Sequence, residues 1–108
     1  MKQLLWIGTS YKVVGNWPKA VKQAAGYQLH LLQQGFEPDD WKPMKIIGSG
    51  VREVRLHTEG EYRVLYIAKF EEGVYVLHAF EKKTQKTSNA DIQMAKDRFR
   101  ELMRARKS

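Results

Sequence analysis

Hydrophobic and polar residues alternate along three segments in the middle of the chain. These segments run from Val51 to Thr58, from Glu61 to Phe70 and from Val74 to Phe80. A period of two is typical of β-strands that turn one face to a core. The connections Glu59-Gly60 and Glu71-Glu72-Gly73 are short enough to be hairpin turns. The pattern therefore predicts an antiparallel meander.

Apolar residues also recur at helical spacing on both sides of the meander. A first set lies between Pro18 and Gly35, three or four positions apart, and comprises Val21, Ala25, Leu29 and Leu32. Because proline suits the first turn of a helix and glycine its end, we expect a helix from about Trp17 to Gly35. A second helix should follow the capping box Ser88-Asn89-Ala90-Asp91, with an apolar face that comprises Ile92, Ala95, Phe99, Leu102 and Met103. We expect its tail, residues 104–108, to fray.

Two further segments complete the expected order of elements. Leu4 to Ile7 is a short apolar run closed by Gly8, which is consistent with a first strand. Residues 36–50 are rich in turn-forming residues and lack a period, so we expect an ordered loop there. The order β-α-loop-β-β-β-α predicts one α+β domain over residues 1–108. It should be a curved, mainly antiparallel sheet flanked by helices that cover one of its faces.

One charged residue falls in the centre of this expected sheet. Arg63 shares a face of the middle strand with Leu65 and Ile67, where a solvated arginine is not expected. A salt bridge to Glu53 or Glu61 is one explanation. The other is a guanidinium that faces an anion site on the uncovered side of the sheet.

Positive charge gathers in the last quarter of the chain. The formal net charge is +7. Residues 1–81 hold 10 Lys/Arg and 9 Asp/Glu, whereas residues 82–108 hold 9 and 3. A local basic patch attracts polyanions such as nucleic acid, although basic surface also serves solubility.

Composition excludes several other classes of protein. The chain has no cysteine, which excludes disulfides, thiolate nucleophiles and cysteine-ligated zinc. No stretch approaches the roughly 18 apolar residues of a membrane span, and the N-terminal apolar run is too short for a signal peptide, so we expect a cytoplasmic protein. The histidines at positions 30, 57 and 78 have no metal-binding spacing. We therefore assign no metal and no small-molecule cofactor.

Several strings of residues resemble one protein family over nearly the whole chain. They include Val51 to Leu56, Glu61 to Tyr66, Asp40-Trp41-Lys42-Pro43-Met44 and above all Val76 to Thr87. These strings resemble the phage-derived, HigB-like branch of the RelE/ParE toxin superfamily. The resemblance implies a RelE-like fold and a toxin of a type II toxin–antitoxin system. It also implies a ribosome-dependent endoribonuclease that cleaves mRNA, inhibits translation and is neutralised by an antitoxin, often of the helix-turn-helix type.

The sequence offers the residue types that metal-independent RNA cleavage needs. Attack of a 2′-hydroxyl on the adjacent phosphate requires a base, cations around the phosphorane and an acid for the leaving oxygen. Arg63 resembles the strand arginine of the family, and its planar fork suits a phosphate. Glu53 and Arg55 share one face of the preceding strand, where Glu53 is either the base or a residue that orients Arg63. Lys83 resembles the basic residue that follows the last strand in the family.

Other polar residues are candidates for positioning RNA. They lie in the loop after the last strand and in the excursion over residues 36–50, and they are Lys42, Lys45, Lys82, Gln85 and Lys86. Such side chains contact phosphate and sugar without reading the base. A run of charge is also typical of an ordinary solvated surface.

Two other functions remain open. One is a non-enzymatic, ParE-like toxin that acts on DNA gyrase, and the other is a simple nucleic-acid-binding module. The set Glu53, Arg55, Arg63 and Lys83 favours a ribonuclease, because a protein that only binds does not need it. Most aromatic residues alternate with apolar ones as in a core, rather than as a base-stacking surface. We expect Arg63→Ala to remove charge and little packing, and so to leave the fold intact.

Overall fold

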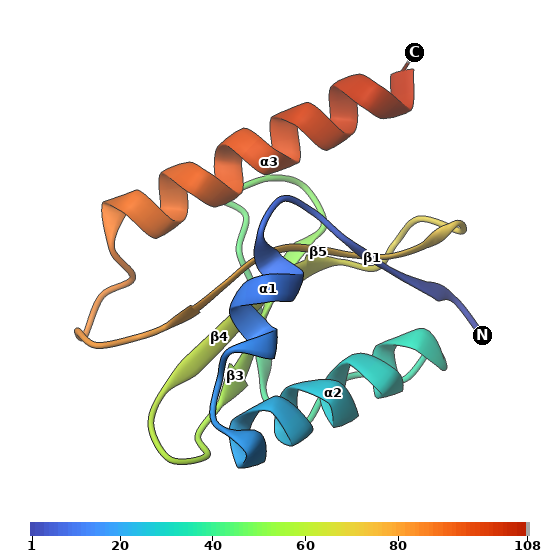
Figure 1. Cartoon of the computed structure of the whole chain (residues 1–108). Coiled ribbons are helices and arrows are strands. Elements are labelled where there is room, and N and C mark those ends of the chain that lie inside the picture. Colours follow the sequence, from blue (N-terminus) through green and yellow to red (C-terminus); the bar gives the residue numbers. More distant parts are fainter. Residues whose placement is uncertain (108) are drawn as a thin grey trace.

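In the computed structural model, which describes residues 1–107, a five-stranded sheet is flanked by helices (Figure 1). The elements in chain order are β1 (Gln3–Trp6), α1 (Ser10–Gly15), α2 (Lys19–Gln33), β2 (Trp41–Pro43), β3 (Val51–Leu56), β4 (Tyr62–Ile67), β5 (Gly73–Glu81) and α3 (Asn89–Lys107). The strand order is β1-β5-β4-β3-β2. This confirms the α+β class.

The predicted meander forms the centre of the sheet. β3 pairs with β4 and β4 with β5 in antiparallel fashion, and β1 adds to the far side of β5 as a parallel strand. The other edge is β2, a strand of three residues in the segment that we expected to be a loop. Its backbone pairs with β3, with Lys42 opposite Glu53. The first short helix, α1, is also absent from the sequence prediction.

Helices cover both faces of the sheet, so the prediction that they cover one face is wrong. Along β4, even-numbered side chains such as Val64 join a core with α1 and α2. Odd-numbered ones such as Leu65 join a second core, to which α3 contributes Ala95 and Leu102. Figure 1 shows α3 on one side of the sheet and α2 on the other. Arg63 therefore lies on the face that α3 partly covers.

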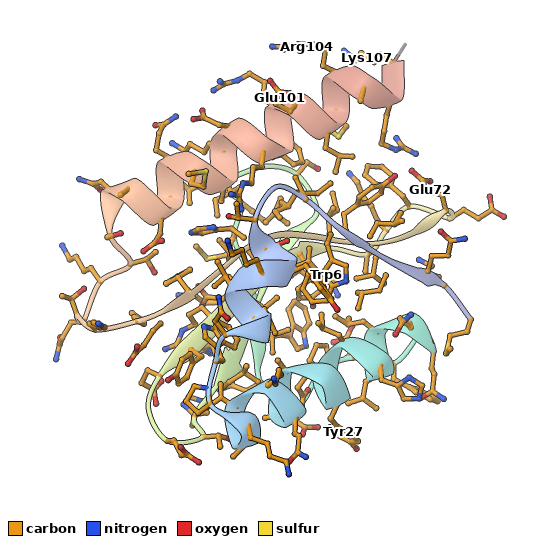
Figure 2. All side chains as sticks on the ribbon, in the orientation of Figure 1. Trp6, Tyr27, Glu72, Glu101, Arg104 and Lys107 are labelled. Carbon is orange, nitrogen blue, oxygen red and sulfur yellow. The ribbon has the colours of Figure 1, made fainter. Side chains whose placement is uncertain are left out.

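Polar contacts at both ends hold α3 in place. The Ser88 hydroxyl oxygen accepts a hydrogen bond from the Asp91 N–H at 3.1 Å and donates one to Asp91 Oδ2 at 2.7 Å, which confirms a cap at Ser88 but not the reciprocal bond of a capping box. At the other end, Arg106 binds Glu72 at 2.7 Å and lies over the Phe70 ring. Figure 2 shows Glu72 at the end of the molecule where α3 ends. The helix extends to Lys107, so residues 104–107 are helical and not the frayed tail that the sequence predicted, and Ser108 lies outside the described residues.

Candidate functional site

Strand pairing brings four of the predicted residues onto one face of the sheet. Lys42 lies opposite Glu53 in the β2–β3 pair, and Arg55 lies opposite Arg63 in the β3–β4 pair. Because side chains on one strand alternate between faces, Glu53 and Arg55 point to the same side. These residues therefore form one charged cluster beside the core under α3.

The Arg63 side chain is buried, and its two terminal nitrogens are directed to internal partners. The residue is 6% exposed. Its Nη1 donates to the Tyr62 carbonyl at 3.0 Å, and its Nη2 lies 3.0 Å from Glu61 Oε1. Its Nε lies 3.7 Å from Glu53 Oε1, too far for a hydrogen bond. Both salt bridges considered from the sequence are thus present, and the guanidinium does not face an uncovered surface.

Glu53 is the most deeply buried charged residue of the cluster, at 1% exposed. Lys42 Nζ lies 3.9 Å from Glu53 Oε1. Within residues 1–107, Glu53 Oε2 accepts no hydrogen bond. Burial of a carboxylate oxygen that accepts no hydrogen bond costs free energy, because the oxygen loses its hydration and gains no partner. In this conformation its nearest charged neighbours are Arg63 and Lys42, which fits the orienting role that the sequence left open beside that of a base.

A histidine between two carboxylates extends the cluster beyond the predicted residues. His57 follows β3, and its Nε2 lies 2.7 Å from Asp40 Oδ2. Its Nδ1 lies 2.9 Å from Glu61 Oε2. The hydrogen bond to Asp40, followed by that to Glu61, raises the pKa of His57. Conversely, the hydrogen bond with His57 is the main cause that lowers the pKa of Asp40 and of Glu61.

The sequence assigns no site role to His57, and Asp40 enters there only in a turn-rich segment and in a string that resembles the family. The signal for His57 was the presence of Glu61 four positions later, across the hairpin turn. Asp40 gave no such signal, because its contact with Arg55 depends on the unpredicted strand β2. There the Asp40 carbonyl accepts the Arg55 N–H at 2.9 Å, and Asp40 Oδ1 accepts from Arg55 Nε at 3.2 Å.

Together these contacts form one series of alternating charges, which we call the ion-pair network. In order of contact its members are Arg55, Asp40, His57, Glu61, Arg63, Glu53 and Lys42. Cations and anions alternate along the whole series. The network thus ties β2, β3 and β4 together at one end of the sheet.

The segment after β5, residues 82–88, leaves the sheet beside this network, and we call it the basic loop. The Lys82 N–H donates to the Glu61 carbonyl at 2.7 Å. A small pocket of about 160 Å³ is lined by Phe80 and by loop residues that include Lys82, Lys83 and Lys86. Lys83 and Gln85 are exposed. Lys82 therefore contacts the network through its backbone, and the other predicted residues of the loop, Lys83, Gln85 and Lys86, follow it within four positions of the chain.

Lys45 is the predicted residue that the fold does not bring to this place. β2 runs antiparallel to β3, and the Met44 N–H donates to the Val51 carbonyl at the start of β3. Lys45 follows at that end of the strand, whereas Arg55 lies near the other end. Lys42, in contrast, lies beside Glu53 within the network.

The described residues offer neither a metal centre nor a membrane span. Residues 1–107 contain no group of three or more His, Asp and Glu side chains arranged to hold a metal ion. In the same part of the chain, no helix has the length and apolar character needed to cross a bilayer.

Comparison with known proteins identifies a family. The family model of phage-derived Gp49-like proteins matches residues 12–100, which include every member of the ion-pair network and the basic loop. No curated protein sequence matches the chain significantly. Because the match covers most of the sequence, the chain belongs to the phage-derived Gp49-like family, whose members are commonly toxin-like proteins of toxin–antitoxin systems.

Proposed function

We propose that this protein is a HigB-like toxin of a type II toxin–antitoxin system, with one toxin domain over residues 1–108. Its activity is metal-independent cleavage of mRNA on the ribosome, in the cytoplasm, which inhibits translation. Family membership supports the toxin role. The observation that carries the proposal of a nuclease is the pairing of Arg55 with Arg63 across β3 and β4, flanked by a buried carboxylate and a basic loop.

Each step of the proposed cleavage reaction is assigned to residues of the site. A base removes the proton of the 2′-hydroxyl, the 2′-oxygen attacks phosphorus, and the bond to the 5′-oxygen breaks as that oxygen takes up a proton. Arg63 and Arg55 stabilise the extra negative charge of the phosphorane, because guanidinium groups hold phosphate oxygens bidentately. Glu53 is the candidate base or the residue that orients Arg63. Lys83, in the basic loop, is the candidate acid whose ammonium group donates that proton to the leaving 5′-oxygen.

RNA binding is proposed for the lysines around this site. Lys42 flanks the network on β2, and Lys82, Gln85 and Lys86 lie in the basic loop. Phosphate contacts of this kind set the register of the RNA. Lys45, at the far end of β2, would contact RNA that extends along the sheet edge.

The partners follow from the same proposal. A protein antitoxin, of the helix-turn-helix type that the resemblance implies, holds the toxin inactive, and the ribosome presents the mRNA. Neither a small-molecule cofactor nor a membrane has a part in this mechanism.

The test is to map the 5′ ends of cellular messages after induction of the protein without its antitoxin. We expect new ends within reading frames, together with arrested growth. Arg55→Gln should abolish both, because Arg55 is about one-third exposed in its side chain and contributes charge more than packing. Arg100→Gln is the matched control, since it removes an exposed arginine of α3 that pairs with Asp97.

Intact messages during growth arrest would refute cleavage. If plasmid supercoiling changed at the same time, the protein would be a gyrase toxin of the ParE kind. Full activity of a folded Arg55→Gln protein would refute the assignment of the site.

A further inference from the structure

His57 occupies a place in the ion-pair network that only its charged form satisfies. Its two ring nitrogens each lie within 3.0 Å of a carboxylate oxygen, one of Asp40 and one of Glu61. An ionised carboxylate only accepts hydrogen bonds, so both nitrogens must carry a proton to be bonded. The arrangement is therefore that of an imidazolium. The ring is still 54% exposed, so it exchanges protons with solvent.

The two carboxylates that His57 binds are also the partners of the two central arginines. Glu61 Oε1 lies 3.0 Å from Arg63 Nη2, and Asp40 Oδ1 lies 3.2 Å from Arg55 Nη2. Asp40 thus contacts His57 through Oδ2 and Arg55 through Oδ1, whereas Glu61 Oε1 lies 3.0 Å from both Arg63 Nη2 and His57 Nδ1. His57 is the point at which the two arms of the network meet.

A phosphate that binds to Arg63 or Arg55 must compete with these internal carboxylates. The Nη1 and Nη2 groups of Arg63 already have acceptors, the Tyr62 carbonyl and Glu61. A carboxylate displaced into the vicinity of a phosphate would repel it unless another cation held that carboxylate. His57 already binds both carboxylates, and it needs no new contact to do so.

We propose that His57 is a positioning residue of the anion site: as an imidazolium it retains the Glu61 and Asp40 carboxylates while an RNA phosphate takes their place on Arg63 and Arg55. This inference rests on the proposed function for the identity of the anion. With His57 charged, the network holds four cations and three anions. With His57 neutral the charges cancel, so the site attracts a phosphate more strongly in the protonated state.

The surroundings of His57 determine the direction of this pH dependence. Asp40 faces it from the segment before β2, and Glu61 from the start of β4, with Glu59 in the intervening turn. Arg55 of β3 and Arg63 of β4 lie behind these carboxylates. Lys82 and Glu81 stand at the adjacent end of β5, where Glu81 lies opposite Tyr62. The direct contacts are both anionic, so the proton stays on His57 to a higher pH than on a free imidazole.

The first experiment measures binding of a single-stranded oligoribonucleotide with 2′-O-methyl groups, which cannot be cleaved, between pH 6 and pH 9 at low salt. We expect the wild-type affinity to fall roughly fivefold to tenfold over this range, as expected for loss of one nearby unit charge. His57→Gln should bind at every pH as weakly as the wild type does at pH 9. His57→Arg, whose charge is permanent, should keep the high affinity at pH 9. His30→Gln is the matched control, because His30 is an exposed histidine of α2.

A second measurement needs no variant. Proton binding and RNA binding are linked, so the oligoribonucleotide must raise the pKa of His57 by roughly 0.7 to 1 unit if protonation raises affinity fivefold to tenfold. The ring resonances of His57 in a nuclear magnetic resonance titration report this directly, with His30 as the internal reference.

Three results would overturn the inference: an unchanged His57 pKa on RNA binding, a folded His57→Gln protein with wild-type affinity at all pH values, or no binding of the oligoribonucleotide at pH 6. Message mapping with Arg55→Gln tests the proposed function separately. If His57 controls binding but messages stay intact, the nuclease proposal fails and the anion site stands. If messages are cut but His57 has no effect on RNA binding, the proposed role of His57 fails and the nuclease proposal is supported.

Discussion

Replacement of Arg63 by alanine should destabilise the fold strongly, contrary to the expectation from sequence. Arg63 is 6% exposed and Glu53 is 1% exposed, so the substitution leaves a buried carboxylate whose remaining cation is Lys42, at 3.9 Å. Removal of one partner from a buried ion pair typically costs about 3–5 kcal/mol. The whole free energy of unfolding of a domain is roughly 5–15 kcal/mol. Arg63→Ala should therefore remove a large share of it.

A double-mutant cycle isolates the buried charge as the cause. Glu53→Gln alone should destabilise the protein, because it removes the negative charge that lies 3.7 Å from the buried Arg63 guanidinium. The same Glu53→Gln change should stabilise the Arg63→Ala protein, since it neutralises the stranded carboxylate. We expect a coupling free energy of about 2–3 kcal/mol between the two sites.

Urea denaturation followed by circular dichroism measures all four corners of the cycle. Arg100→Ala is the control, because its side chain is 63% exposed and its loss should change stability by less than about 0.5 kcal/mol. The reasoning fails if Arg63→Ala costs less than about 1 kcal/mol, or if Glu53→Gln has the same effect with and without Arg63. The result also decides how toxicity data are interpreted, because loss of toxicity in Arg63→Ala alone does not separate catalysis from unfolding.

Three further predictions concern the attachment of α3 and the backbone before α1. Ser88→Ala removes the cap of α3 and should cost about 0.5–2 kcal/mol in urea denaturation; no change would mean that the cap contributes nothing. Gly8→Ala should cost about 1–2 kcal/mol in the same assay, because Gly8 has a φ of 57° and a Cβ there would come within 2.7 Å of the Arg98 guanidinium. Arg106 lowers the pKa of Glu72 to about 2, so this carboxylate stabilises the fold above its ordinary pKa of 4.5, and that contribution should be lost as pH falls from there toward 2. Glu72→Gln should flatten the acid limb of the stability curve between those values, and an unchanged limb would show that the pair has no effect.

The parts of the fold that sequence predicts are those whose signal is local. The meander follows from period-two alternation and short glycine-containing turns, and the start of α3 follows from the Ser88 cap. β2 has only three residues, and its strand conformation depends on pairing with β3, which no local pattern reveals. The placement of α3 on the second face depends on tertiary packing, which is why the predicted open face of the sheet is wrong.

The same division explains which members of the ion-pair network could be placed together from the sequence. Arg63, Arg55 and Glu53 were predictable because alternation and hairpin register place them on one face. Asp40 reaches the network only through the β2–β3 pairing, and His57 has a defined role only once Asp40 is beside it. Local pattern thus predicts the shared face of residues within one hairpin, but it does not predict a contact with a residue such as Asp40 that a longer connection brings to the network.

The ion-pair network should bind a phosphate that belongs to an RNA strand more tightly than a free phosphate. A single free phosphate would gain contacts with Arg63 but would displace Glu61 from it, so the net gain is small. An RNA strand bound as proposed would add contacts with the basic loop, which leaves the sheet beside Glu61, and each phosphate contact there would release counterions. In the proposed function the loop therefore supplies the affinity, and the network supplies the selectivity for a phosphate held at one position. On the proposed function, removal of charge from Lys82, Lys83 and Lys86 should weaken RNA binding without changing its pH dependence, whereas His57→Gln should abolish the pH dependence.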